Sequence, residues 1–87
     1  MRYYVEFTSE ATGKFLSLDK VVSQRVLDKL KWLSHNFDDL TPEVLTGELK
    51  GFYKLRVGSY RVIYTVNHDK SLLTVYLIGH RRNIYKR

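Results

Sequence analysis

The 87-residue sequence has no cysteine, a single proline, and no apolar run approaching the ~18 residues that a membrane span requires. Without cysteine the chain has neither a disulfide framework nor a thiolate metal site, which suits a reducing compartment. Its first ten residues, MRYYVEFTSE, lack the apolar core of a signal peptide. We therefore expect a cytoplasmic protein without a membrane partner, folded as one domain over residues 1–87.

Metal ligands are also scarce. The histidines His35, His68 and His80 lack the spacing of a ligand motif, and residues 50–87 contain no carboxylate cluster. The sequence therefore predicts neither a metal site nor another cofactor.

Acidic residues are nearly absent from the second half of the chain. Residues 50–87 hold nine Lys or Arg against Asp69 alone, a charge of +8, whereas residues 1–49 carry a charge of −2. Five of the seven tyrosines lie in the same basic half. Such a split within one small domain indicates a basic face, whose commonest partners are polyanions. The alternative is a solvated surface that happens to be basic.

Hydrophobic periodicity predicts an α+β domain that begins with a strand and two helices. Tyr3–Phe7 alternates as a strand, a short helix runs from Thr8 to about Ser17, and Asp19 is suited to cap a second helix. The second helix has the clearest apolar stripe of the chain: Val22, Val26, Leu30, Leu33 and Phe37. Trp32 flanks this stripe and is interpreted as a core or boundary residue rather than a ligand platform.

The rest of the chain predicts a loop and three strands. The loop contains Pro42 and Gly47 and is expected to form one helical turn at Pro42–Leu45. The strands are Phe52–Val57, Tyr60–Val66 and Ser71–Gly79, with a primed hairpin turn at Gly58-Ser59 between the first two. The resulting order is βααβββ, with the two helices packed on a small, mostly antiparallel sheet.

Alternation along the predicted hairpin puts Lys54 and Arg56 on one face, and a two-residue turn can bring Arg61 to the same face. No acid lies near them in the sequence, so we expect these cations to repel one another unless an anion binds among them. Edge protection by ordinary exposed cations is the alternative. The central strands are apolar on both faces, yet two helices cover only one. We therefore expect the second face to be concave, to hold a ligand, or to be covered by another chain.

The segment GELKGFYKLRVGSYRVIY, followed by LIGHRRNIY, closely resembles the RelE/ParE toxin superfamily of prokaryotic type II toxin–antitoxin systems. The resemblance covers almost the whole chain and implies a RelE-like fold. In the RelE branch it implies a ribosome-dependent endoribonuclease that cuts messenger RNA in the ribosomal A site and inhibits translation. A ParE-like inhibitor of DNA gyrase without nuclease activity, or a degenerate toxin that only binds its antitoxin, are the alternatives.

The resemblance also implies roles for individual residues, and the RelE branch is favoured because every position of its catalytic set is filled. The residues assigned to catalysis are Lys54, Arg56, Arg61, Arg81 and Tyr85. The neighbouring basic residues expected to bind RNA are Lys50, Arg82, Lys86 and Arg87.

His80 is an additional acid–base candidate. In the last strand, alternation puts Val75, Leu77 and Arg81 on one face and His80 on the other, so a regular strand cannot aim Arg81 and His80 into one site.

Cleavage of RNA needs no metal, because the 2′-hydroxyl can attack the adjacent phosphate and leave a 2′,3′-cyclic phosphate and a 5′-hydroxyl. We expect Arg61 and Arg81 to hold the scissile phosphate. Lys54 is expected to act as the base, and Tyr85 to stack on a nucleobase. We also expect Ala at position 61 or 81 to leave the fold intact, because charged side chains on an open face contribute little to stability.

The implied partners are a cognate antitoxin with an acidic segment, the ribosome A site with its messenger RNA, and operator DNA reached through the antitoxin. An acidic segment would be attracted to the basic half of the chain and would place carboxylates near its cations.

Overall fold

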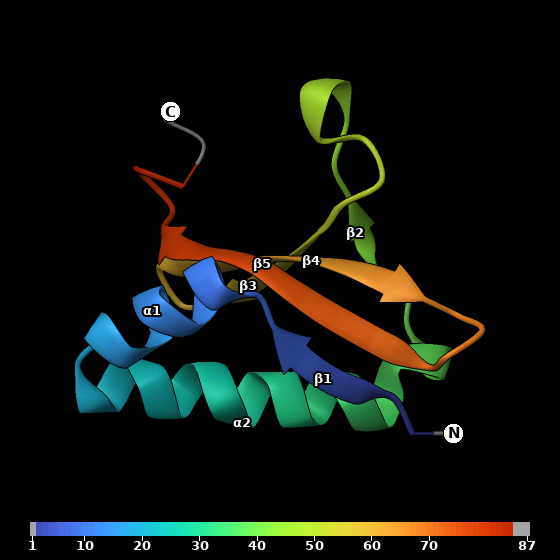
Figure 1. The fold of residues 1–87 in the computed structure, drawn as a ribbon, viewed down its shortest axis with the longest axis horizontal. Helices are drawn as coiled ribbons and strands as arrows, with labels where there is room; N and C mark the ends of the chain where they lie inside the picture. Colours follow the sequence, from blue (N-terminus) through green and yellow to red (C-terminus); the bar gives the residue numbers. More distant parts are fainter. Residues whose placement is uncertain (1, 85–87) are drawn as a thin grey trace.

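The computed structural model describes residues 2–84 as a five-stranded sheet with two α-helices on one side (Figure 1). The strands are β1 Tyr4–Phe7, β2 Glu43–Val44, β3 Tyr53–Val57, β4 Tyr60–Asn67 and β5 Leu72–His80. The helices are α1 Ser9–Ser17 and α2 Lys20–Asn36, with 3₁₀ turns at Phe37–Asp39 and Gly47–Leu49. Apart from the short strand β2, this is the expected βααβββ order, and the α+β prediction is confirmed. Within residues 2–84, no helix has the length and apolar character needed to cross a bilayer.

Both helices begin at capping side chains. The Thr8 hydroxyl accepts a hydrogen bond from the backbone N–H of Ala11 at 3.1 Å, and Asp19 Oδ1 accepts one from the N–H of Val22 at 3.0 Å. These bonds satisfy N–H groups that the first turn of a helix leaves without an intrahelical partner. The prediction of Asp19 as an N-cap is confirmed.

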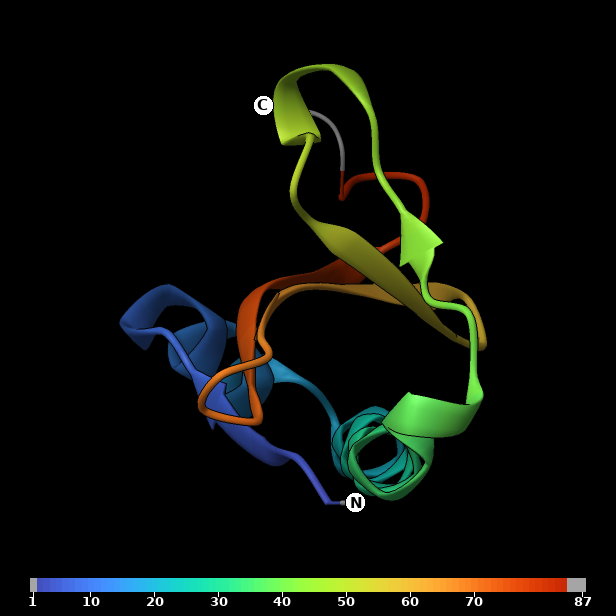
Figure 2. The same ribbon diagram turned by 90° about the vertical axis from the view of Figure 1, so that its right-hand side faces the viewer.

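The strands lie in the order β1-β5-β4-β3-β2. β1 runs parallel to β5, and all other neighbouring strands are antiparallel. Two parallel strands cannot be joined by a tight turn, and α1 and α2 form part of the long connection on one face of the sheet (Figures 1 and 2). The central strands β5, β4 and β3 therefore have one face against the helices and one face turned away from them.

The main core lies between α2 and the sheet. Val26, Leu30 and Leu33 of α2 are almost fully buried, as is Phe37 just after the helix. The sheet contributes Leu55, Val57, Val62, Tyr64, Leu73 and Val75. A buried aliphatic side chain of this size contributes about 1.5–3 kcal/mol. The predicted stripe of α2 is therefore confirmed as core, with Val22 only partly buried at its beginning.

The pairing of β4 with β5 shifts by one residue between Ile63 and Tyr64. Ile63 pairs with Leu77, whereas Tyr64 pairs with Val75, which makes Tyr76 an extra residue in β5. A bulge of this kind interrupts the alternation of faces. Val75 joins the main core while Leu77 does not. The expectation that these two residues share a face is therefore wrong.

The sheet face opposite the helices is partly covered by the chain itself. After β5 the backbone turns, and the N–H of Ile84 donates to the His80 carbonyl at 3.0 Å. A Cβ on Gly79 would lie 2.9 Å from Ile84 Cδ1, so glycine allows Ile84 to sit directly on the strand. Ile63, outside the main core cluster, is nevertheless 0% exposed. The second apolar face is therefore in part an internal core.

The prediction of a helical turn at Pro42–Leu45 is wrong. Glu43 and Val44 are extended and pair with Lys54 and Tyr53 at the edge of β3. An extended backbone can bond to this edge, which a helical turn cannot do. The segments that follow β2 and β5 both rise from the sheet face opposite α2 (Figures 1 and 2).

Candidate functional site

The basic residues of the β3–β4 hairpin gather on the sheet face turned away from α2. Arg56 stands directly opposite Arg61, and Lys54 stands opposite Ile63. Residues paired across two strands project to the same face. The register thus puts Lys54, Arg56 and Arg61 on one face, as alternation predicts. Like charges that face each other directly are destabilising unless other groups balance them.

A carboxylate from β2 balances two of these cations. Glu43 Oε2 lies 2.9 Å from Lys54 Nζ and 3.0 Å from Arg56 Nη2, and its Oε1 accepts a hydrogen bond from Arg56 Nε at 3.1 Å. The hydrogen bonds from Arg56 and then Lys54 lower the pKa of Glu43 to about 2. The anion expected among these cations is therefore, in the protein without a ligand, a carboxylate of the chain itself. The acid is distant in the sequence and reaches the cations through β2–β3 pairing, in which Glu43 stands opposite Lys54.

Arg61 is not a cation on an open face. Only 8% of the residue is exposed, and its Nη1 donates to the carbonyls of Gly58 at 2.9 Å and Tyr60 at 2.8 Å. Gly58 has a φ of +58°, a conformation that glycine adopts without steric cost. A guanidinium carries five donors, so it can satisfy turn carbonyls that strand pairing does not reach. The Arg61 side chain therefore fastens the hairpin turn, and its expected position on an open face is wrong.

Arg81 and Arg82 are exposed just after β5. The backbone N–H of Arg81 donates to the Ser59 carbonyl at 2.8 Å, and that of Arg82 donates to His80 Nδ1 at 3.2 Å. The first bond anchors the segment after β5 beside the β3–β4 turn. Arg81 therefore joins the hairpin from a second part of the chain.

The other residues with an expected role in RNA binding lie elsewhere or beyond the described residues. Lys50 is exposed at the end of the 3₁₀ turn Gly47–Leu49, on the loop between β2 and β3. Tyr85, Lys86 and Arg87 lie outside the residues that the structure describes.

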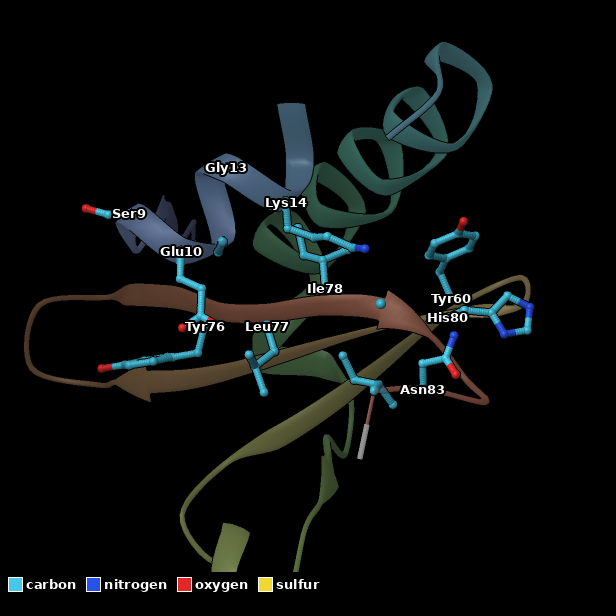
Figure 3. A pocket seen from close by; sticks show the side chains of 13 residues that line it. Ser9, Glu10, Gly13, Lys14, Tyr60, Tyr76, Leu77, Ile78, His80 and Asn83 are labelled. Atoms are coloured by element: carbon cyan, nitrogen blue, oxygen red, sulfur yellow. The ribbon is translucent and has the colours of Figure 1, made fainter. Parts of the chain in front are cut away.

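His80 lies on a different side of the sheet. It pairs with Tyr60 of β4, and the two rings meet edge to face with their centroids 5.6 Å apart. Both residues line a hollow of about 830 Å³, and Glu10 and Lys14 of α1 lie along its other side (Figure 3). The structure therefore does not bring His80 together with the hairpin cations. Across residues 2–84, no three His, Asp or Glu side chains form a group that could hold a metal ion.

Glu43 is the member of the site that sequence reasoning missed. The sequence marks it poorly, because the strand that carries it, Glu43–Val44, is only two residues long and lies in a segment with the composition of a loop. Its partner Lys54 belongs to the strand that follows the loop, so their contact depends on tertiary pairing.

Known proteins resemble this chain in sequence and in architecture. A family model described as "ParE toxin of type II toxin-antitoxin system, parDE" matches residues 5–85. The chain is also 30% identical over 86 residues to an Escherichia coli protein named as a RelE-like toxin, covering 93% of this chain and 85% of that protein. Both matches extend over most of the sequence.

Two solved structures share the fold. A chain in the crystal structure of a toxin–antitoxin complex from Mycobacterium tuberculosis superposes with a TM-score of 0.83 at 24% identity, covering 93% of this chain and 100% of that chain. A chain in the archaeal RelE–RelB complex from Pyrococcus horikoshii gives a TM-score of 0.73 at 27% identity, with 95% and 99% covered. The arrangement of sheet and helices is therefore one that these chains also adopt.

The different environments of Arg56 and Arg61 predict different effects on stability. We expect Arg61→Ala to lower the free energy of unfolding by about 1–3 kcal/mol, because it removes the donor to two turn carbonyls. Arg56→Ala is the matched control. Its side chain is 58% exposed and ion-paired, so the loss should be within about 1 kcal/mol. Urea unfolding followed by circular dichroism measures both, and equal stability of the two variants would contradict the assigned role of Arg61.

The Glu43 carboxylate should titrate well below an ordinary glutamate. Its pKa is lowered from 4.5 to about 2 in the folded chain, so its ion pairs stabilise the fold above about pH 4.5 and are lost as the pH falls towards 2. NMR titration of the side-chain carboxyl carbon measures this midpoint directly. Arg56→Ala should move the midpoint upward, and a midpoint near 4.5 in the unaltered chain would disprove the contact.

Proposed function

This chain belongs to the ParE toxin family, within the RelE/ParE superfamily of type II toxin–antitoxin toxins, and we propose that it is a ribosome-dependent endoribonuclease that cuts messenger RNA and so inhibits translation. The resemblance seen in the sequence is confirmed at the level of the superfamily. The proposal concerns its activity, and it is supported by the geometry of the hairpin cations.

One observation carries the proposal: a single carboxylate oxygen contacts both Lys54 and Arg56. Glu43 Oε2 lies within 3.0 Å of a nitrogen of each side chain. Two cations that converge on one oxygen form a site that can also accept a phosphate oxygen, because carboxylate and phosphate present similar acceptors to a guanidinium. Glu43 then acts as the counterion of this site in the protein without RNA, and a phosphate would have to displace it.

The proposed reaction uses the RNA itself as nucleophile. The 2′-hydroxyl loses its proton, its oxygen bonds to the adjacent phosphorus, and the bond from phosphorus to the 5′-oxygen breaks. The products are a 2′,3′-cyclic phosphate and a 5′-hydroxyl that gains a proton. The protein must accept one proton, supply another, and stabilise the extra negative charge in between.

We propose a division of these tasks that differs from the one expected from the sequence. Arg56 is proposed to hold the scissile phosphate. Lys54 is proposed to accept the proton of the 2′-hydroxyl after it has released its own proton, because a charged ammonium has no lone pair to accept one. Arg81 is proposed to stabilise the leaving oxygen from its position beside the hairpin turn, while that oxygen receives its proton through water. Arg61 acts mainly by fixing the turn that presents the other cations, because its guanidinium bonds to two carbonyls. Tyr85 keeps its proposed stacking role.

No group in this set is a strong base, so the ribosome is proposed to contribute by positioning the message. Holding the 2′-oxygen in line with the leaving oxygen can lower the barrier by several kcal/mol without any new chemical group. This explains why free RNA would bind to the basic face and yet be cut only slowly.

A cognate antitoxin is the proposed protein partner. The solved structures from Mycobacterium tuberculosis and Pyrococcus horikoshii are described as toxin–antitoxin and RelE–RelB complexes, which supports such a partner here. We propose that its acidic segment lies over the hairpin cations, and that contact with operator DNA is made through the antitoxin.

Inhibition of DNA gyrase is the second candidate function. It is favoured by the family match, whose description names ParE toxins. It needs no catalytic residues, so it predicts that the hairpin cations can be changed without loss of toxicity.

Cleavage on programmed ribosomes tests the proposed activity. We expect Arg56→Ala and Arg81→Ala each to slow cutting roughly 100- to 1,000-fold, as the loss of one donor to a transition-state anion does elsewhere. Primer extension on a translated message measures the rate. Lys70→Ala, an exposed cation in the turn between β4 and β5, is the control and should cut at the normal rate. Normal cutting by a folded Arg56→Ala or Arg81→Ala protein would overturn the assignment. Inhibited supercoiling with intact messages would favour the gyrase reading.

The counterion role of Glu43 makes a separate prediction. Glu43→Gln should bind a single-stranded 2′-O-methyl oligonucleotide more tightly and with a salt dependence steeper by about one released counterion. Glu48→Gln removes the same charge from an exposed position in the neighbouring loop and is the matched control. Fluorescence anisotropy at several salt concentrations measures both. If the two variants gain equal affinity, net charge alone accounts for the effect and Glu43 has no special place in the site.

A further inference from the structure

Trp32 is the only tryptophan of the chain, and it lies at the surface of α2. It is 46% exposed, although a large aromatic side chain contributes most to stability when it is buried. Lys29 Nζ lies 4.2 Å from the centroid of its ring, a cation–π contact. Of the two positions expected for this residue, core and boundary, the structure supports the boundary.

Two hollows adjoin Trp32 along the edge of β3, and both are lined by Lys29, Trp32 and Arg56. The first, of about 260 Å³, extends to Lys54 and so reaches the proposed phosphate site. The second, of about 460 Å³, extends along α2 to Arg25. In the described part of the chain β2 pairs with only two residues of β3. The two hollows lie beside the part of the β3 edge that β2 does not cover.

The charges around Trp32 favour an anionic ligand. Four cations line the two hollows, against the acids Asp28 and Glu43. Glu43 bridges Lys54 and Arg56, whereas Asp28 Oδ1 accepts a hydrogen bond from the uncharged Gln24 at 2.9 Å, and the four cations still exceed the two acids. A ligand that approaches Trp32 therefore meets a net positive surface.

We infer that Trp32 and Lys29 form a nucleotide subsite for single-stranded RNA. The Lys29 ammonium, which lies over the indole in the protein without RNA, moves off the ring to pair with a phosphate, and a base stacks on the indole in its place. A nucleotide carries a flat ring and an anion a few ångströms apart, and these two side chains present the complementary groups. Arg56 lines both hollows and connects this subsite to the phosphate site. The inference rests on the proposed function, because the RNA that it places at Trp32 is the continuation of the strand whose phosphate binds at Lys54 and Arg56.

An acidic protein segment is the competing occupant of the same surface. Its carboxylates would satisfy the cations, but they offer nothing that stacks on an exposed indole. RNA uses both features, because bases stack on aromatic side chains while phosphates pair with Lys and Arg. The observations therefore favour RNA over an acidic peptide.

The single tryptophan allows a direct test with the full chain. A single-stranded 2′-O-methyl oligonucleotide, which cannot be cleaved because the attacking hydroxyl is blocked, is added while tryptophan fluorescence is recorded. Stacking should quench Trp32, and the quenching should weaken steeply with salt. Trp32→Ala, with binding followed by anisotropy, should lose about 5- to 100-fold in affinity. Lys29→Gln should retain the quenching but reduce the salt dependence by about one counterion.

Leu16→Ala is the control, because this exposed apolar residue lines neither hollow and should bind normally. Unchanged Trp32 fluorescence on saturation, or equal affinity of Trp32→Ala, would overturn the subsite. Quenching by poly-glutamate but not by the oligonucleotide would overturn it in favour of an acidic protein segment. The proposed nuclease can fail on ribosomes while the quenching persists, and the quenching can be absent while ribosomal cutting is normal, so the two proposals fail separately.

Discussion

Gly58 and Arg61 fix the register of the β3–β4 hairpin, and both the core and the basic face depend on that register. In the observed pairing Leu55 and Val57 face α2 while Lys54 and Arg56 face away. A slip by one residue would exchange the two sets, because side chains alternate along a strand. It would bury two cations in the core at a cost of several kcal/mol each. A turn with one strongly preferred register is therefore as important for the charges as for the packing.

Placing several cations on one small face is unfavourable without an anion, and the fold supplies one. Strand β2 is only two residues long, yet it carries Glu43 to a position where it contacts two cations at once. The pairing of β2 with β3 brings Glu43 close to Lys54 and Arg56. The ion pairs in turn hold β2 against β3, so the two interactions support each other. A surface pair of this kind contributes little to stability. The main effect of these ion pairs is electrostatic. In the protein without a ligand, Glu43 balances the charges of Lys54 and Arg56 and holds the two side chains close together.

The sequence predicts the parts of this protein that depend on neighbouring residues. The cap at Asp19 and the stripe of α2 follow local rules, and so does the shared face of Lys54 and Arg56. What it does not predict depends on contacts between distant segments. The bulge at Tyr76 reverses the faces of β5 without a glycine or proline to mark it, and Glu43 acquires its partners only through sheet pairing. Burial of Arg61 likewise depends on where its turn carbonyls point, which a pattern of charges does not reveal.

The same electrostatics would serve both the substrate and the inhibitor in the proposed function. An RNA phosphate, a carboxylate of an antitoxin and Glu43 are all anions that suit the pair of Lys54 and Arg56, so no two can occupy it fully at the same time. Glu43 is attached to the chain and has a high effective concentration, but it offers only one charge. A flexible acidic segment offers several charges and can also cover apolar surface, so it can exclude RNA where Glu43 alone cannot. Trp32 differs from these cations because its indole would bind a nucleobase by stacking, whereas the cations bind an anion. A surface that combines both would bind RNA through its phosphates and its bases, whereas the carboxylates of an antitoxin segment can replace only the phosphates.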